Sequence, residues 1–201
     1  MKGKVLPFNV YKGRKSDVFM CKILRNIQGK TAQEIIAIYG NDELPVDMEA
    51  IAKKIGIQVR AMDFTDIEKE VDLEPGIILG ATVADGEDVS IYYRISDCDN
   101  RKKFTIAHEI AHCCLHTEDL IEQHIELRGN RRAQHGREYE ANIFAGELLI
   151  SEEKLKNIYD QLLRPSLSAL CEIFEVSANV MAARLDYLNM PYFKDMGLRE
   201  A

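Results

Sequence analysis

The chain lacks the features of a membrane or secreted protein. None of its apolar runs approaches the roughly 20 residues that a membrane-spanning helix needs, and the most apolar stretch near the N-terminus, DVFMCKIL, is interrupted by Lys22. A small-residue cleavage site is also missing there, so no signal peptide is expected. The composition, 46% hydrophobic and 29% charged, is that of a globular protein. We therefore expect a cytoplasmic protein with no membrane partner.

The five cysteines fit neither a disulfide framework nor a cysteine zinc knuckle. Their number is odd, Cys113 and Cys114 are adjacent, and no C-x-x-C pair occurs. The thiols are expected to be reduced and to behave mostly as small buried apolar groups. Internal repeats and low-complexity tracts are absent too, and 201 residues suffice for one ordinary domain plus a small appendage.

Acidic residues outnumber basic ones in the chain as a whole but not at its N-terminus. The formal net charge of −7 argues against general nucleic-acid binding. Residues 1–30, however, hold eight Lys or Arg and one acid, Asp17. This basic N-terminal arm has two interpretations: a solvated, partly disordered segment, or a docking arm for an acidic surface or nucleic acid.

The first half of the chain is patterned as a mixed α+β fold. Helices are predicted over 31–39, starting at Thr31, and over 46–56, ending at Gly56. Residues 57–64 alternate like a strand. The segments GIILGATV and VSIYYRIS flank ADGED, which predicts a β-hairpin with Asp85-Gly86 at its turn.

The second half is predicted to be mainly helical. A helix is expected to begin near Arg101, capped by the polar DCDN, and an irregular excursion over 117–136 separates it from a helix over 137–150. These elements complete a core over 31–150. Several short helices are expected in the C-terminal segment, 151–201.

The stretch FTIAHEIAHCCLH, residues 104–116, contains the histidines and the glutamate that could bind a metal ion and act as a general base. Residues four apart on a helix differ by only about 40° in direction and about 6 Å in rise, so His108 and His112 project from the same face. Two imidazoles at that spacing can bind one zinc ion, and Glu109 can take a proton from a water beside it. The residues thus form an H-E-x-x-H motif. The alternative is a core helix with two hydrogen-bonded histidines.

A third ligand would favour the metal site. His116 continues the series, but three ligands on one straight helix span about 12 Å of rise, too far for bonds of about 2 Å. The better candidate is Glu138 on the following helix, with Asn142 one turn later to hold the outer N–H of a ligand histidine. Glu140 is a rival ligand, although it points about 200° away from Glu138 on a helix. Glu147 is interpreted as a salt-bridge residue.

FTIAHEIAH followed by REYEANIFAGELLI resembles the ImmA/IrrE family of zinc-dependent bacterial metallopeptidases, as does the upstream PVDMEAIAKKIGIQV. The resemblance covers roughly residues 30–190, although Ile150-Ser151 stand where the family pattern usually has Met-Pro. It implies a zincin-like (gluzincin-like) core, one Zn²⁺ per chain held by His108, His112 and Glu138, and Glu109 as the general base. It also implies a protein substrate, a helix-turn-helix transcriptional repressor of mobile-element, prophage or stress genes, cut at one site.

Two further expectations concern how a peptide substrate would bind and react. An extended peptide is expected to pair with the edge strand of the hairpin, SIYYR. The group that stabilises the oxyanion is unassigned, and the candidates for an oxyanion or channel role are His116, Tyr139 and Arg184.

The segment 165–188 raises a separate question. Two predicted helices around a Val176-Ser177 turn resemble a helix-turn-helix unit. The second helix has one basic residue, Arg184, and one acidic residue, Asp186, so it carries no net positive charge. A structural or docking role is therefore favoured over DNA reading. Two rivals to the peptidase remain open: a DNA-binding regulator with a structural metal site, and a non-catalytic anti-repressor that sequesters its target.

Overall fold

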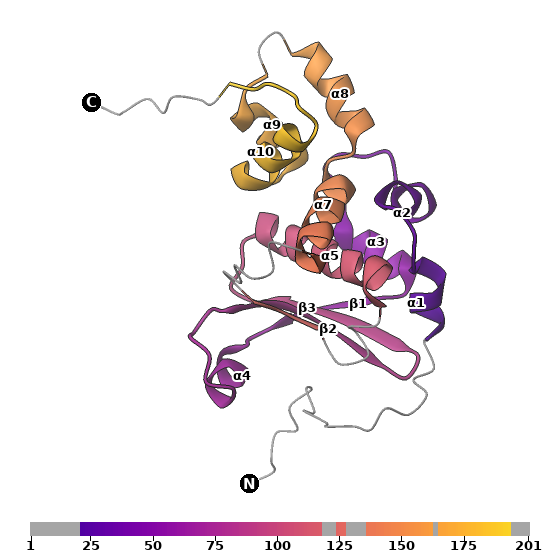
Figure 1. The fold of residues 1–201 in the computed structure, drawn as a ribbon, viewed down its shortest axis with the longest axis vertical. Coiled ribbons are helices and arrows are strands. Elements are labelled where there is room, and N and C mark those ends of the chain that lie inside the picture. The colour runs from indigo at the N-terminus through magenta and orange to yellow at the C-terminus, as the bar shows by residue number, and fades with distance from the viewer. Residues whose placement is uncertain (1–20, 118–123, 128–135, 163–164, 194–201) are drawn as a thin grey trace, which may run out of the picture.

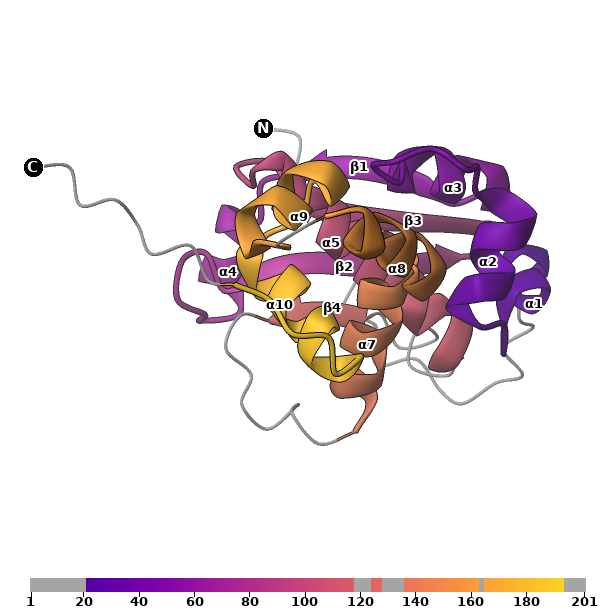
Figure 2. The same ribbon diagram turned by 90° about the horizontal axis from the view of Figure 1, so that it is seen from above.

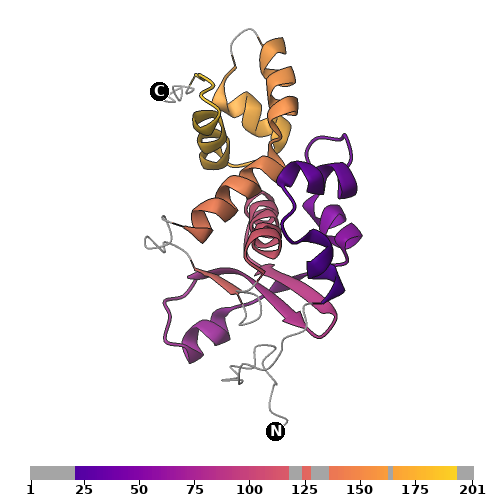
Figure 3. The same ribbon diagram turned by 45° about the vertical axis from the view of Figure 1, so that its right-hand side comes forward.

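Helix α5 (Asp99–Leu115) lies between a sheet and helix α7 (Arg137–Leu149) in the computed structural model, which describes residues 21–117, 124–127, 136–162 and 165–193. The sheet, α5, α7 and the C-terminal helices follow one another as layers (Figure 1 and Figure 3). The fold is therefore mixed α+β, as predicted. Helix α5 starts two residues earlier than expected, after the N-cap residue Cys98, whose side chain makes no capping bond.

The helices before the sheet follow their sequence signals. Helix α2 (Ala32–Tyr39) begins after Thr31, whose side chain accepts the N–H of the third helical residue in a capping box. Helix α3 (Met48–Ile55) ends at Gly56, whose φ of 103° favours glycine. Both helices were predicted, and α3 buries the four apolar side chains that the helical spacing selects: Met48, Ile51, Ala52 and Ile55.

The end of the basic arm belongs to the folded core. Residues Lys22–Ile27 form helix α1, in which Leu24 and Ile27 are buried in the main hydrophobic cluster. This helix was not predicted, because a single apolar pair three residues apart, surrounded by Lys and Arg, is too short a pattern to indicate a buried helix. Residues 1–20, the rest of the predicted arm, lie outside the described residues.

Within the described part of the chain, four strands form the sheet, in the order β1-β3-β2-β4. Strand β1 (Gln58–Met62) pairs in parallel with β3 (Asp88–Arg94), and β2 (Ile78–Asp85) pairs antiparallel with both β3 and β4 (His124–Leu127). The predicted strand at 57–64 and the predicted hairpin are confirmed. The turn is shifted by one residue, because Asp85 pairs with Asp88 and leaves Gly86-Glu87 as the loop.

Two predictions about the sheet are wrong. SIYYR, expected as an edge, belongs to the inner strand β3, because the connection from β1 through α4 (Thr65–Glu70) and β2 leaves β1 paired in parallel beside it. The excursion over 117–136 was expected to be irregular, yet it contains β4, which forms an edge of the sheet beside β2. The other residues of that excursion, 118–123 and 128–135, lie outside the described part of the chain.

A buried ion pair fixes the start of β2 to α4. The Glu68 carboxylate accepts the N–H groups of Gly76 and Ile78 and binds the Arg94 guanidinium. Burial by itself raises the pKa of Glu68, but the two backbone N–H groups and Arg94 outweigh it, so this pKa lies below its usual value. The second hydrophobic cluster, which includes Phe64 and Ile67, adjoins this pair.

The C-terminal segment forms three helices on the far side of α7: α8 (Glu152–Gln161), α9 (Leu167–Phe174) and α10 (Ala178–Tyr187). Figure 2 shows α9 and α10 above α5 and the sheet. Helices α8, α9 and α10 start after serine caps and pack into the main hydrophobic cluster. The predicted short helices are therefore confirmed, and they share one apolar core with α5 and α7. Residues 163–164 and 194–201 lie outside the described residues.

Candidate metal centre

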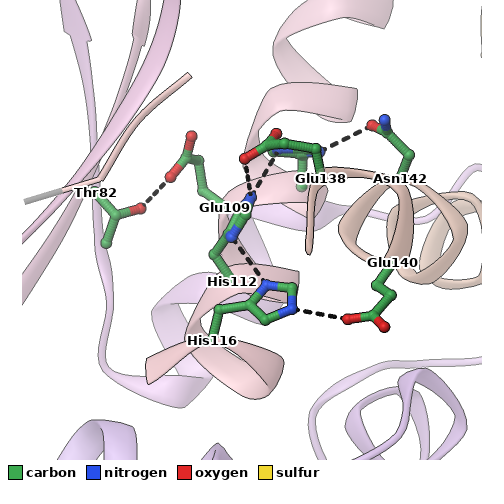
Figure 4. Close-up of polar contacts among 8 residues, drawn as sticks. Thr82, Glu109, His112, His116, Glu138, Glu140 and Asn142 are labelled. Atoms are coloured by element: carbon green, nitrogen blue, oxygen red, sulfur yellow. Dashed lines mark hydrogen bonds and ion pairs between the residues drawn. The ribbon is translucent and has the colours of Figure 1, made fainter. Parts of the chain in front are cut away.

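Helices α5 and α7 bring His108, His112 and Glu138 together (Figure 4). The two histidines are one turn apart on α5 and almost fully buried, with 1% and 0% of their surface exposed. Glu138 lies in the first turn of α7 and is half-buried. The sequence prediction that this glutamate, on a second helix, faces the histidine pair agrees with the geometry.

The three ligand atoms have the spacing of a metal site. The Nε2 atoms of His108 and His112 lie 3.0 Å apart, and the Glu138 carboxylate oxygens lie 3.2 Å from the first and 3.4 Å from the second. Bonds of about 2.0–2.1 Å at tetrahedral angles place neighbouring ligand atoms roughly 3.3 Å apart. Two imidazoles and a carboxylate are also a usual donor set for a catalytic zinc ion. The residues therefore fit a single divalent metal ion.

Asn142 sets the orientation of the first histidine. Its Oδ1 lies 3.0 Å from His108 Nδ1, and because an amide oxygen can only accept, Nδ1 carries the proton. The proton-free Nε2 then faces His112 and Glu138. This is the role that the sequence assigned to Asn142, one turn after Glu138.

A second chain of hydrogen bonds supports His112. Its Nδ1 lies 3.1 Å from His116 Nδ1, and His116 Nε2 lies 3.0 Å from a Glu140 carboxylate oxygen. The carboxylate accepts from His116 Nε2–H, so His116 Nδ1 accepts from His112 Nδ1–H and leaves His112 Nε2 as the ligand atom. The structure thus places His116 and Glu140 behind the metal-binding group rather than in it. Glu140, the rival ligand in the sequence, binds His116 instead.

Glu109 is fully buried on the sheet side of α5, and its Oε2 accepts a hydrogen bond from Thr82 on β2 at 2.5 Å (Figure 4). The bond ties the carboxylate of the H-E-x-x-H motif to the sheet. Sequence reasoning missed Thr82. Its signal was a single hydroxyl in the middle of the apolar run IILGATVA, where burial requires a hydrogen-bond partner.

Close packing beside Glu109 explains Gly80. A Cβ at this position would lie 2.5 Å from Thr105 Cγ2 and 3.2 Å from Glu109 Oε1. We expect Gly80→Ala to lower the free energy of unfolding by about 1–3 kcal/mol, the usual effect of overpacking. Urea denaturation measures this loss. The double variant Gly80→Ala/Thr105→Ser, which removes the clashing methyl group, should recover most of it. Equal losses in the single and double variants would show that this contact is not limiting.

Two further sequence candidates lie elsewhere. Arg184 on α10 is 4% exposed, its Nε donates to Ile150 O at 3.0 Å, and its guanidinium lies 3.8 Å from Glu147. Its role is therefore to hold α10 to the end of α7, and the salt bridge predicted for Glu147 is present. Tyr139, next to Glu138, is 53% exposed.

The adjacent thiols of α5 are separate from the metal-binding group. Cys113 and Cys114 are buried, and burial raises the pKa of the Cys113 thiol strongly and that of Cys114 to about 12. Both thiols are therefore protonated at neutral pH. All five cysteines are free, and three of them are buried as expected, whereas Cys98 is exposed.

A search of curated proteins found no match to this chain. In the part of the chain that the structure describes, no helix combines the length and apolarity needed to cross a membrane. A family model described as the IrrE N-terminal-like domain, which belongs to a class of peptidases, matches residues 52–186. The match covers more than half of the chain and includes β2, α5, α7 and most of α10. The chain therefore belongs to the ImmA/IrrE family of peptidases.

Proposed function

We propose that this protein is a zinc-dependent endopeptidase with a zincin-like core. The observation that carries the proposal is the group of His108, His112 and Glu138, whose ligand atoms all lie within 4.8 Å of one another beside a buried glutamate. A zinc ion held by these three side chains, one per chain, would polarise the scissile carbonyl and lower the pKa of water.

The remaining steps are assigned to the chain's own residues. Glu109 is the general base: its carboxylate accepts a proton from the attacking water and delivers it to the nitrogen of the leaving amine. The Thr82 hydroxyl holds the Glu109 carboxylate in place, and Asn142 and His116 fix the tautomers of the two histidines. Tyr139 is retained as the oxyanion candidate, because His116 lies behind His112 and Arg184 is buried against Ile150.

The substrate backbone is proposed to pair with β4 (His124–Leu127). An extended peptide adds most readily to the edge of a sheet, and β4 occupies an edge of this one, next to the strand that carries Thr82. The strand proposed from the sequence, SIYYR, is enclosed by β1 and β2 and cannot serve.

The substrate class is proposed to be a helix-turn-helix repressor, which is cut once to derepress mobile-element, prophage or stress genes. Resemblance to the family supports this. The residues 165–188 resemble a helix-turn-helix unit themselves, but the one base of α10, Arg184, is buried and bound to Ile150 and Glu147. A helix that reads DNA needs exposed basic side chains, so α10 supports a structural or docking role.

Co-expression with the repressor encoded by the adjacent gene tests the proposal. We expect the intact mass of the repressor to show a single cut with the wild-type chain and none with Glu109→Gln. A repressor that is inactivated but full length with both chains would contradict peptidase action and indicate sequestration. Promoter binding that is salt-dependent and unchanged by Glu109→Gln would indicate a DNA-binding regulator instead.

A further inference from the structure

An apolar cavity of about 400 Å³ lies between α7 and α10, outside the metal-binding group. Its size is within the range of pockets that bind small organic groups. The walls come from three helices, and the lining includes Phe104, Tyr139, Asn142, Gly146, Ala183 and Tyr187.

The cavity adjoins the proposed catalytic centre. Asn142 lines it and also holds His108. The Phe104 ring lines it as well, with its centroid 6.1 Å from that of the His108 ring. Tyr139, at the exposed rim, directly follows Glu138. A peptide whose carbonyl group lies at the metal-binding group can therefore reach the cavity with a neighbouring side chain.

Gly146 keeps this space open. A glycine inside a helix destabilises it by about 1 kcal/mol relative to alanine, so a buried one within α7 needs a reason. No heavy atom lies within 4 Å of the position that a Cβ at Gly146 would occupy. Close packing therefore does not require glycine here, and the missing side chain instead adds volume to the cavity.

The lining favours an uncharged, apolar occupant. Among the residues that the structure describes, Arg184 is the one charged residue of the lining; its Nε donates to Ile150 O, and its buried Nη2, which makes no hydrogen bond, lies 3.8 Å from Glu147. The two tyrosines of the lining, Tyr139 and Tyr187, are 53% and 52% exposed, which provides aromatic surface at the entrance. A carboxylate would lose its hydration here and would have to compete with Glu147 for the Arg184 guanidinium, whereas an ammonium group would meet that guanidinium as a like charge.

We propose that this cavity receives a large apolar side chain of the substrate, leucine or phenylalanine in kind, next to the scissile bond. Helix α10 then forms part of the specificity site, with Ala183 on the wall opposite Gly146. The identification of the occupant as part of a substrate rests on the proposed peptidase function. Binding of an apolar side chain in the cavity can be tested independently of that function.

Binding is measured by NMR on the full chain, isotope-labelled and carrying Glu109→Gln so that no cleavage occurs. The probes are the N-acetyl amides of leucine, phenylalanine, aspartate and lysine. Saturable shifts of the Gly146 amide and the Ala183 methyl are expected with leucine and phenylalanine, with at least tenfold weaker binding of aspartate and lysine. Shifts of equal size with all four probes, or none with leucine and phenylalanine, would overturn the proposal.

Filling the cavity provides the matched test. Gly146→Phe should weaken binding of the leucine probe at least tenfold, and Gly146→Ala, which adds a single methyl group to the same open space, should weaken it by a smaller factor. If Gly146→Phe does not fold, Ala183→Phe gives the same test from α10, where the residue is exposed. Unchanged binding in the filled variant would overturn the proposal.

The two proposals fail separately. A chain that cuts its repressor but binds no apolar probe has the peptidase function without this specificity site. A chain that binds the probes but cuts nothing retains an apolar binding cavity, and the proposed function fails.

Discussion

Loss of zinc is the expected result of Glu138→Gln. The substitution keeps the shape of the side chain but removes the negative charge that lies 3.2 and 3.4 Å from the two imidazole nitrogens. We expect zinc affinity to fall by more than about 100-fold, beyond the 10–100-fold effect of removing an outer hydrogen-bond partner. Competition with a chromophoric chelator and zinc content per chain measure the change.

Glu140→Gln is the matched control for this experiment. It is the same substitution two residues later on α7, and its amide oxygen can still accept from His116 Nε2–H. Zinc content should stay near that of the wild type. Equal zinc loss in both variants would mean that the charge of α7, rather than direct ligation by Glu138, holds the ion. Zinc far below one per chain in the wild type would contradict the metal centre itself.

Glu109→Gln should abolish most of the cleavage while leaving the metal bound. Glutamine cannot accept and return a proton, so the cleavage rate should fall by about 10²–10⁴-fold. Zinc content should not change, because the Glu109 carboxylate is not one of the three grouped ligands. Single-turnover cleavage of the repressor, followed by mass spectrometry, gives the rate.

Variants of Thr82 distinguish the positioning of the Glu109 carboxylate from the proton transfer that Glu109 itself performs. Thr82→Val removes the hydroxyl that binds Glu109 Oε2, and loss of a hydrogen bond to a charged group should slow cleavage roughly 10–100-fold. Thr82→Ser keeps the hydroxyl and should stay within about threefold of the wild type, since most of the hydrogen bond survives. A fall in Thr82→Ser as large as in Thr82→Val would assign the effect to packing. Wild-type rates in Glu109→Gln would exclude Glu109 as the base.

The shared face of the candidate ligands on α5 was predictable because local geometry fixes it. Helical periodicity places His108 and His112 on one face whatever surrounds them, and the same rule places Asn142 one turn from Glu138. The role of Glu140 depends instead on how α5 and α7 pack against each other, which the sequence does not show. Its partner, His116, lies at the C-cap of α5, where the chain departs from the helix that the periodicity assumes.

The sheet was harder to predict because pairing between distant segments decides it. The sequence pattern of β3 suits an edge strand and an inner strand equally well, so only the parallel pairing of β1 with β3 shows that SIYYR is enclosed. Strand β4 is only four residues long, with two polar and two apolar residues, and its partner lies more than 40 residues away. The Thr82–Glu109 contact depends on the same pairing and was missed for the same reason.

Helix α5 is buried over ten consecutive residues, Thr105 to Cys114, with the sheet on one side and α7 on another. Its amide hydrogens should therefore exchange with solvent only when the whole domain unfolds. Helix α10, at the periphery, can open at a lower free energy. The histidines and the glutamate of the candidate site thus lie on the segment that is expected to open last, whereas α10, which lines the adjoining cavity, is expected to open sooner.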